Sequence, residues 1–117
     1  MTDKIVVLVT CGSISEARRI AKAVVRARLA ACVNISAATV ESVYRWKGKV
    51  EKTREYLLFM KSTRKRFGAL RHEIERMHGY DVPEIIALPV VEGLTPYLRW
   101  VEESVRPPAQ LRSRARD

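Results

Sequence analysis

The sequence contains few cysteines and no long apolar run. Only two cysteines, Cys11 and Cys32, occur among 117 residues, and this number excludes a disulfide-rich scaffold. The longest apolar run covers residues 85–91 and is interrupted by Pro89, so it is far too short to span a bilayer. The N-terminal residues also lack the basic and apolar segments of a signal peptide. We therefore expect a cytoplasmic protein that has no membrane as a partner.

The motifs of common enzymes are also missing from this sequence. Its two histidines, His72 and His78, lie six residues apart, and six residues turn an ideal helix by about 600°, so the two side chains point apart. No nucleophile elbow and no HExxH motif accompany them. Residues 10–15 could hold an anion at a helix N-terminus, but this loop contains no arginine. We predict that the protein is not an enzyme.

Basic residues exceed acidic ones, and the formal net charge is +9. Residues 106–117 contain four arginines and too few apolar side chains to become ordered, so we predict a single domain over residues 1–105 followed by a disordered basic tail. The charge favours weak anion binding in general. Specific RNA recognition would require paired aromatic residues on one strand face, but Tyr56 and Phe59 are an odd number of residues apart. We expect no specific nucleic-acid partner.

Hydrophobic patterns in the first half predict a strand, a helix and a long hairpin. Residues 4–10 form an apolar run rich in β-branched residues, typical of a strand that is buried on both faces. Apolar residues then recur at helical spacing over residues 14–29, after a capping pattern that begins at Ser13. Two strand segments at residues 31–35 and 39–46 follow, with a bulge or bend between them. Lys47 and Gly48 then form a turn into a strand over residues 49–61.

The second half predicts another helix, a strand and a short terminal helix. The helix begins after Ser62 or Thr63 and ends at Gly79. Its apolar face consists of Phe67, Leu70, Ile74 and Met77. A strand over residues 83–91 and a short helix with Thr95 as its N-cap complete the chain. The order β-α-β-β-α-β predicts an α+β, ferredoxin-like sandwich with an extended hairpin between its second and third strands and a C-terminal helix.

This arrangement leaves one face of the sheet without a long helix to cover it. Burial of that face against further copies of the same chain is the economical solution, so we expect self-association. The polar hairpin projects from the core, and its exposed edges provide a second surface for pairing with another subunit.

Several separate segments, taken in order, are similar to one known family. The chain resembles the CutA family of divalent-cation tolerance proteins through residues 28–35, 44–48, 55–61, 78–84 and 97–100. The resemblance implies a ferredoxin-like homotrimer packed around a three-fold axis by its hairpins. It also implies a cytoplasmic role in tolerance to copper and other divalent cations, without an agreed enzymatic activity or an organic cofactor. The trimer is similar to that of the PII signalling proteins, which leaves a nucleotide or small anion between subunits as an alternative ligand.

The resemblance points to His78 as a ligand for Cu(II) or another divalent cation. Neighbouring carboxylates and either Cys32 or Cys11 are candidate further ligands, since copper favours imidazole and thiolate. Two alternatives stay open: His78 as a charged residue at the end of a helix, and the cysteines as small buried hydrophobic residues. Val9 and Met77 correspond to positions where some family members carry additional ligands, which leaves His78 as the matching one.

A second group of residues resembles the cluster that family members carry at their subunit junction. This junction cluster consists of Tyr44, Trp46, Glu55, Lys61, Tyr80 and Glu84. Glu84 enters a strand that is otherwise free of charge, so we predict that it pairs with Lys61 or with an arginine of a neighbouring subunit. Tyr44 and Trp46 share one strand face and could both line the junction, where aromatic residues are common. An anionic ligand between subunits would use Lys61.

Overall fold

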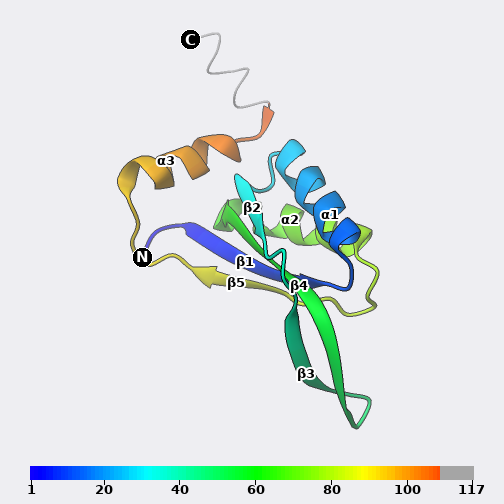
Figure 1. Ribbon diagram of the computed structural model, residues 1–117. Coiled ribbons are helices and arrows are strands. Elements are labelled where there is room, and N and C mark those ends of the chain that lie inside the picture. The colour runs from blue at the N-terminus through cyan, green and yellow to red at the C-terminus, as the bar shows by residue number, and fades with distance from the viewer. Residues whose placement is uncertain (109–117) are drawn as a thin grey trace.

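The computed structural model describes residues 1–108 and confirms the predicted order of elements (Figure 1). The strands are β1 (Lys4–Cys11), β2 (Cys32–Ile35), β3 (Val40–Trp46), β4 (Lys49–Thr63) and β5 (Ile85–Pro89). The helices are α1 (Ile14–Arg26), α2 (Arg64–Met77) and α3 (Thr95–Ser104). Most of the predicted basic tail lies outside the described residues.

All five strands join one antiparallel sheet in the order β2-β4-β1-β5, and β3 pairs with the distal half of β4. The central strand β1 pairs with β4 on one side and β5 on the other, so that Leu8 lies opposite both Phe59 and Ile86. The long strand β4 therefore belongs to the body through its second half and to the hairpin through its first. This is the predicted ferredoxin-like α+β fold, and the expected interruption separates β2 from β3.

Alternation along β1 decides which face of the sheet becomes the core. Ile5, Val7 and Val9 point toward α1 and α2 and are buried, whereas Val6 and Leu8 point to the opposite face and are half-buried. The core consists mainly of Ile5, Val7, Val9, Ile20, Val24, Leu58, Met60, Leu70 and Ile74. A smaller cluster holds α3 through Val101 and Val105, which pack near Ala31.

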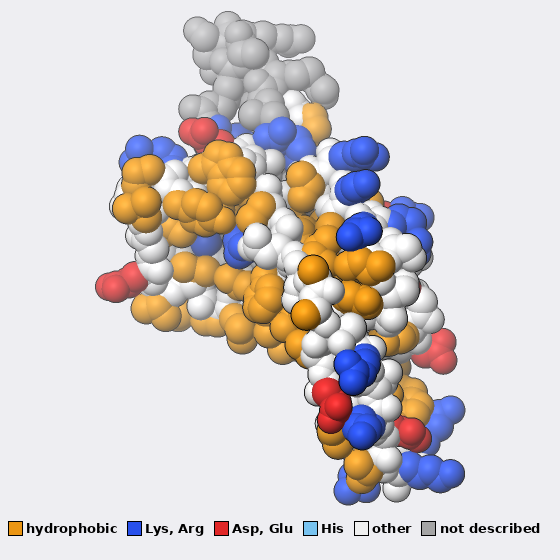
Figure 2. Space-filling view, in the orientation of Figure 1, with side chains coloured by type: hydrophobic (Ala, Val, Ile, Leu, Met, Phe, Trp, Pro, Cys, Tyr) orange, Lys and Arg blue, Asp and Glu red, His pale blue; other side chains and the backbone are white. Residues whose placement is uncertain are grey.

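The opposite face of the sheet is apolar and open, as the sequence predicts. Phe59, Ile86 and Leu88 are 37%, 48% and 47% exposed, although all three lie in strands of the body. Figure 2 shows hydrophobic side chains gathered over this body, whereas the hairpin carries many charged ones. Helix α3 lies at the end of the sheet away from the hairpin tip, so it leaves most of this face uncovered (Figure 1).

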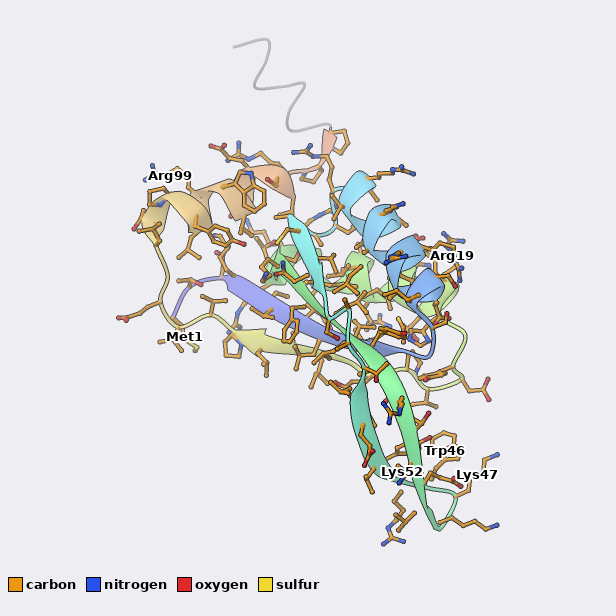
Figure 3. The ribbon with its side chains drawn as sticks, in the orientation of Figure 1. Met1, Arg19, Trp46, Lys47, Lys52 and Arg99 are labelled. Atoms are coloured by element: carbon orange, nitrogen blue, oxygen red, sulfur yellow. The ribbon has the colours of Figure 1, made fainter. Side chains whose placement is uncertain are left out.

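The hairpin of β3 and β4 extends well beyond the body, and the described part of the chain is elongated (Figure 3). Its turn residues Lys47 and Gly48 have φ values of +50° and +79°. Two consecutive positive φ values define the turn type whose twist matches paired antiparallel strands, which confirms the predicted hairpin turn. Lys47 and Trp46 both lie at this end of the molecule (Figure 3).

Three helix boundaries differ from those that the sequence predicts. Helix α1 ends at Arg26 rather than residue 29, because Arg28 has a φ of +60° and cannot continue a right-handed helix. The Arg28 guanidinium instead donates to the carbonyl oxygens of Glu103 and Arg106, both at 2.7 Å. These bonds connect the loop after α1 to the C-terminal end of α3.

The other two boundaries concern α2 and α3. Helix α2 ends at Met77, and its C-cap is His78 in an extended conformation, so Gly79 is not the residue that stops the helix. Helix α3 begins one residue earlier than predicted, with Leu94 as its N-cap and Thr95 already helical. The shift at His78 matters for the site, because it turns the imidazole away from the helix surface and toward the sheet.

Candidate functional site

His78 lies where the end of α2 meets the end of β1. It is almost completely buried, and both of its ring nitrogens have partners. Nε2 donates to the carbonyl oxygen of Thr10 at 2.7 Å, and Nδ1 accepts the backbone N–H of Tyr80 at 3.1 Å. One nitrogen that donates and one that accepts define a neutral imidazole. His78 does lie at the end of α2, where the alternative interpretation places it, but a charged imidazole would donate from both nitrogens.

Cys11 is the last residue of β1, and its sulfur lies beside this imidazole. Its Sγ lies 3.8 Å from Nε2 of His78, and its side chain is fully buried. Burial, followed by the nearby Glu16 carboxylate, raises the pKa of the Cys11 thiol to about 12. The thiol is therefore protonated at neutral pH, and it becomes a thiolate ligand only when a cation displaces that proton.

Glu16 completes the group and was not predicted as a site residue. The sequence predicts a reciprocal cap with Ser13, but only half of it forms: the Glu16 backbone N–H donates to Ser13 Oγ at 3.2 Å. The Glu16 carboxylate instead accepts the backbone N–H of Gly79 at 2.9 Å. One sulfur, one imidazole nitrogen and one carboxylate oxygen thus lie within 4.8 Å of one another, and we call Cys11, Glu16 and His78 the Cys–Glu–His group.

The structure corrects the expected positions of further ligands near His78. Val9 is fully buried in the hydrophobic core, and Met77 packs against that core. The cysteine near the end of the first strand is Cys11, two residues beyond Val9. A cysteine sulfur therefore lies beside His78, although the resemblance places valine at the corresponding position.

Cys32, the other predicted sulfur ligand, lies at a different part of the sheet. Cys32 of β2 pairs with Lys61 of β4, whereas Cys11 of β1 pairs with Tyr56 of β4. Tyr56 and Lys61 are five residues apart, a distance of about 16 Å along a strand. The Cys32 Sγ lies 3.6 Å from Lys61 Nζ and 3.6 Å from Tyr97 Oη. The structure therefore does not bring Cys32 to His78.

Lys61 also lies apart from the other members of the junction cluster. Its ammonium donates to Asn34 Oδ1 on the neighbouring strand β2. Glu84 is exposed, and residues 1–108 contain no ion pair that involves it. The predicted Glu84–Lys61 pair within the chain is wrong, because Asn34 occupies the lysine and the two side chains belong to different regions of the sheet.

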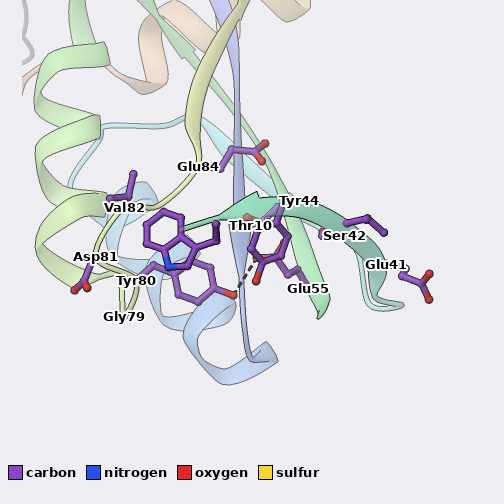
Figure 4. Close-up of a pocket in the computed structure, with 12 residues that line it drawn as sticks. Thr10, Glu41, Ser42, Tyr44, Glu55, Gly79, Tyr80, Asp81, Val82 and Glu84 are labelled. Carbon is purple, nitrogen blue, oxygen red and sulfur yellow. Dashed lines mark hydrogen bonds between the residues drawn. The ribbon is translucent and has the colours of Figure 1, made fainter. Parts of the chain in front are cut away.

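The remaining five members of the junction cluster line one cleft of about 790 Å³ (Figure 4). The cleft lies between the β3–β4 hairpin and the loop that follows α2, and its predicted members are Tyr44, Trp46, Glu55, Tyr80 and Glu84. Tyr80 donates its phenol proton to Glu55 Oε2 at 2.9 Å (Figure 4). Burial, followed by this hydrogen bond, raises the pKa of Tyr80, so the phenol keeps its proton.

The cleft and the Cys–Glu–His group are neighbours. The ring centroids of His78 and Tyr80 lie 4.8 Å apart, and Gly79 between them both lines the cleft and binds Glu16. The short loop after α2 therefore positions one side chain of each site. No helix in the described part of the chain is long and apolar enough to cross a membrane.

Comparison with known proteins assigns the family. The family model described as CutA1 divalent ion tolerance protein matches residues 5–104. This chain belongs to the CutA1 family. A divalent-cation tolerance protein CutA from Thermus thermophilus is 48% identical over 99 residues, which cover 85% of this chain and 95% of the relative. The human protein CutA is 45% identical over 81% of this chain, but this chain spans only 52% of that longer relative.

Solved CutA1 structures share the fold closely. The Thermus thermophilus structure aligns with a TM-score of 0.86 at 47% identity and covers 88% of this chain and 99% of its own. An Archaeoglobus fulgidus structure, described as a periplasmic divalent cation tolerance protein, aligns with a TM-score of 0.84 at 37% identity over 88% of this chain and 99% of its own. The family resemblance and the ferredoxin-like fold that the sequence predicts are therefore confirmed. The family is named for a tolerance and not for a reaction.

Proposed function

We propose that this CutA1 protein acts in divalent-cation tolerance by binding the cation, copper in particular, at the Cys–Glu–His group. The observation that carries this proposal is the convergence of Cys11, Glu16 and His78 from three separate elements. Sulfur and imidazole nitrogen are the donors that copper and zinc favour, and a carboxylate oxygen completes a mixed set. The protein would hold and release the ion as cargo, and it would need no catalytic step.

The size of the group supports a single ion. Bonds of about 2.0 to 2.3 Å place two ligands of one ion no more than about 4.6 Å apart. The Cys11–His78 separation of 3.8 Å is within this limit, and the largest separation of 4.8 Å exceeds it only slightly. Because Glu16 is only half-buried and its carboxylate ends a flexible side chain, a small movement of this residue would close the difference.

A proton and a hydrogen bond oppose the binding of a cation at this place. The Cys11 thiol must lose its proton, and the His78 imidazole must give up the Nε2 hydrogen bond to Thr10 or the Nδ1 hydrogen bond to Tyr80. The site without a cation therefore holds a protonated thiol beside an imidazole whose two nitrogens are both hydrogen-bonded. This arrangement supports reversible capture at raised metal concentration better than permanent retention of a structural ion.

We further propose that the protein works as a homotrimer in the cytoplasm. The open apolar face around Phe59, Ile86 and Leu88 supports association, because soluble monomers rarely expose a contiguous apolar patch on a flat sheet. The two free thiols support a reducing compartment. The PII-like alternative with an anionic ligand gains no support, since Lys61 lies outside the cleft that it would need.

Calorimetric titration tests the metal site most simply. We expect Cys11→Ser to weaken binding of Zn(II) and Cu(II) at least about tenfold, as removal of a metal ligand or its close support does. Zn(II) has no redox chemistry, so it separates binding from oxidation of the thiol by copper. Cys32→Ser is the matched control, because it removes the other free thiol. Equal losses in both variants, or no loss in either, would reject the assignment to Cys11.

The pH dependence of the same titration tests the protonation states. The Cys11 thiol is protonated below its pKa of about 12, so each bound cation releases that proton into solution. Affinity for Zn(II) should therefore rise about tenfold per pH unit between pH 7 and pH 9. Cys11→Ser should show a clearly shallower dependence, and an unchanged slope in that variant would contradict the role of the thiol.

A further inference from the structure

The outward face of α1 carries charge of one sign only. All four basic residues of this helix are exposed, and we call them the basic stripe: Arg18, Arg19, Lys22 and Arg26. Successive helical residues are about 100° apart, so the four side chains fall within an arc of about 100° around the helix. Ser15 is the only other residue in that arc, and the buried residues of α1 lie on the opposite side.

The basic stripe has no acidic partner in the described part of the chain. None of the ion pairs among residues 1–108 includes one of its four side chains. The one acidic residue of α1, Glu16, lies outside the arc and binds the backbone N–H of Gly79. On the neighbouring helix α2, in contrast, two arginines pair with glutamates one turn away. The charge of α1 is therefore available to an external partner.

The spacing of the basic stripe opposes helix stability. Arg18, Lys22 and Arg26 follow one another at four-residue intervals, and like charges at this interval destabilise a helix. A face that only needs contact with water could carry an acidic residue at position 22, which would turn both repulsions into attractions. A bound polyanion would neutralise all three charges, and this is a physical reason to keep them in line.

The basic stripe lies away from the surface proposed for assembly. Helix α1 packs on the buried face of the sheet, whereas Phe59, Ile86 and Leu88 lie on the open face. Figure 2 shows Lys and Arg side chains gathered over α1, and Figure 3 places Arg19 on the body, away from the hairpin tip. The stripe therefore stays accessible in the proposed trimer.

Further arginines follow in the sequence from the C-terminal end of the basic stripe. The Arg28 guanidinium, two residues after Arg26, donates to the carbonyl oxygen of Arg106 at 2.7 Å. Residues 109–117 follow three residues later and contain three more arginines but only one acidic residue. Basic sequence thus continues from the place where the stripe ends.

We propose that the basic stripe binds the phosphate backbone of nucleic acid without preference for a base sequence. Arginine is well suited to phosphate groups, and the stripe from Arg18 to Arg26 is about 12 Å long. A nucleic-acid duplex carries about seven phosphate charges over that length. The arc contains no asparagine, glutamine or aromatic side chain, so its contacts go to phosphates rather than to base edges.

An anionic membrane fits the basic stripe less well. Helices that lie in a membrane surface insert apolar side chains beside their basic ones. The apolar residues of α1 face the core, and Val25 is the one large apolar residue of this helix that is exposed. A lipid surface would therefore be held by charge alone.

Fluorescence anisotropy of a labelled DNA duplex of about 20 base pairs tests the proposal. Four phosphate contacts give a slope of about −3.6 when the logarithm of affinity is plotted against the logarithm of salt concentration. The affinity of the full-length protein should therefore fall at least about 150-fold between about 50 mM and about 200 mM NaCl.

Two triple variants locate the binding. The stripe variant should make the slope shallower by about 2.7, because each lost contact removes about 0.9; its substitutions are Arg18→Gln, Lys22→Gln and Arg26→Gln. The control variant lowers the net charge equally on α2 through Lys65→Gln, Arg71→Gln and Arg76→Gln. The control should change the slope by less than about 1, since two of its arginines are held by glutamates.

Both variants should keep the mass and the copper uptake of the wild-type protein, because the substituted side chains lie outside the open face and the Cys–Glu–His group. Failure of this proposal is therefore distinguishable from failure of the metal site and of the assembly.

Four results would overturn the proposal. The first is no binding of the duplex at about 50 mM NaCl, and the second is an unchanged slope in the stripe variant. Equal changes of slope in the two variants would show that only the net charge matters. Binding to phosphatidylserine vesicles without binding to the duplex would assign the stripe to a membrane.

Discussion

Leu58→Ala is expected to lower the free energy of unfolding by about 3 kcal/mol, within the range of about 2 to 5 kcal/mol for leucine truncation in a packed core. Leu58 lies in the middle of β4 and is completely buried on the helix-covered face of the sheet. Loss of its terminal carbons removes apolar burial and leaves a cavity that rigid strands on either side cannot close. Urea denaturation at fixed protein concentration measures the effect, since unfolding of an oligomer depends on concentration.

Val50→Ala is the matched control for this core substitution. Val50 lies in the same strand but is 67% exposed in the hairpin, so its truncation should change the free energy of unfolding by no more than about 0.5 kcal/mol. If both variants lost equal stability, the division of β4 into a core half and a projecting half would be wrong.

Phe59→Glu is expected to dissociate the proposed homotrimer into single chains. Phe59 is adjacent to Leu58 in sequence but points to the open face, where it lies opposite Leu8 of β1. In a trimer that buries this face, three copies of the new carboxylate would lose water without gaining a partner. Light scattering coupled to gel filtration should show the mass falling from about three chains to one.

A glutamate on the other side of the molecule controls for added charge. Val25 in α1 has nearly the same exposure as Phe59, at 40% against 37%, and it lies in a helix that packs on the opposite face of the sheet. Val25→Glu should leave the mass unchanged. A wild-type protein that runs as a single chain, or a Phe59→Glu variant that stays associated, would contradict the use of this face in assembly.

Much of the fold follows from local patterns that tertiary contacts reinforce. The alternation of β1, the helical spacing of Leu70 and Ile74, and the Lys47–Gly48 turn each predict the element that forms. The boundaries were less predictable, because the end of α1 depends on a contact distant in sequence. Arg28 takes up a left-handed conformation and binds the end of α3, and no pattern around residue 28 indicates this.

The candidate site was predictable only in part. Short segments marked His78 and six junction residues, and five of those six line one cleft. The convergence of Cys11 and Glu16 on His78 could not be derived, because it depends on how the ends of β1, α1 and α2 meet. Glu16 has the spacing of a helix cap, and the hydrogen bond of its carboxylate to Gly79 is decided by packing and not by the local sequence.

The Cys–Glu–His group also relates the proposed metal capture to the stability of the fold. Without a cation, the neutral imidazole of His78 joins Thr10 to Tyr80 and thereby connects β1 with the loop after α2. With a cation, the same imidazole would exchange one of these bonds for a metal bond. This exchange would also affect the cleft, because Tyr80 donates its backbone N–H to His78 and its phenol proton to Glu55.

Native mass spectrometry with added Cu(II) tests the central claim most directly. We expect the assembled wild-type protein to take up one copper ion per chain, and His78→Ala to lose that uptake. His72→Ala is the matched control, because His72 is the other histidine of the chain and is exposed on α2. It should keep the full copper content. Equal copper content in His78→Ala and wild type would contradict metal binding at the Cys–Glu–His group.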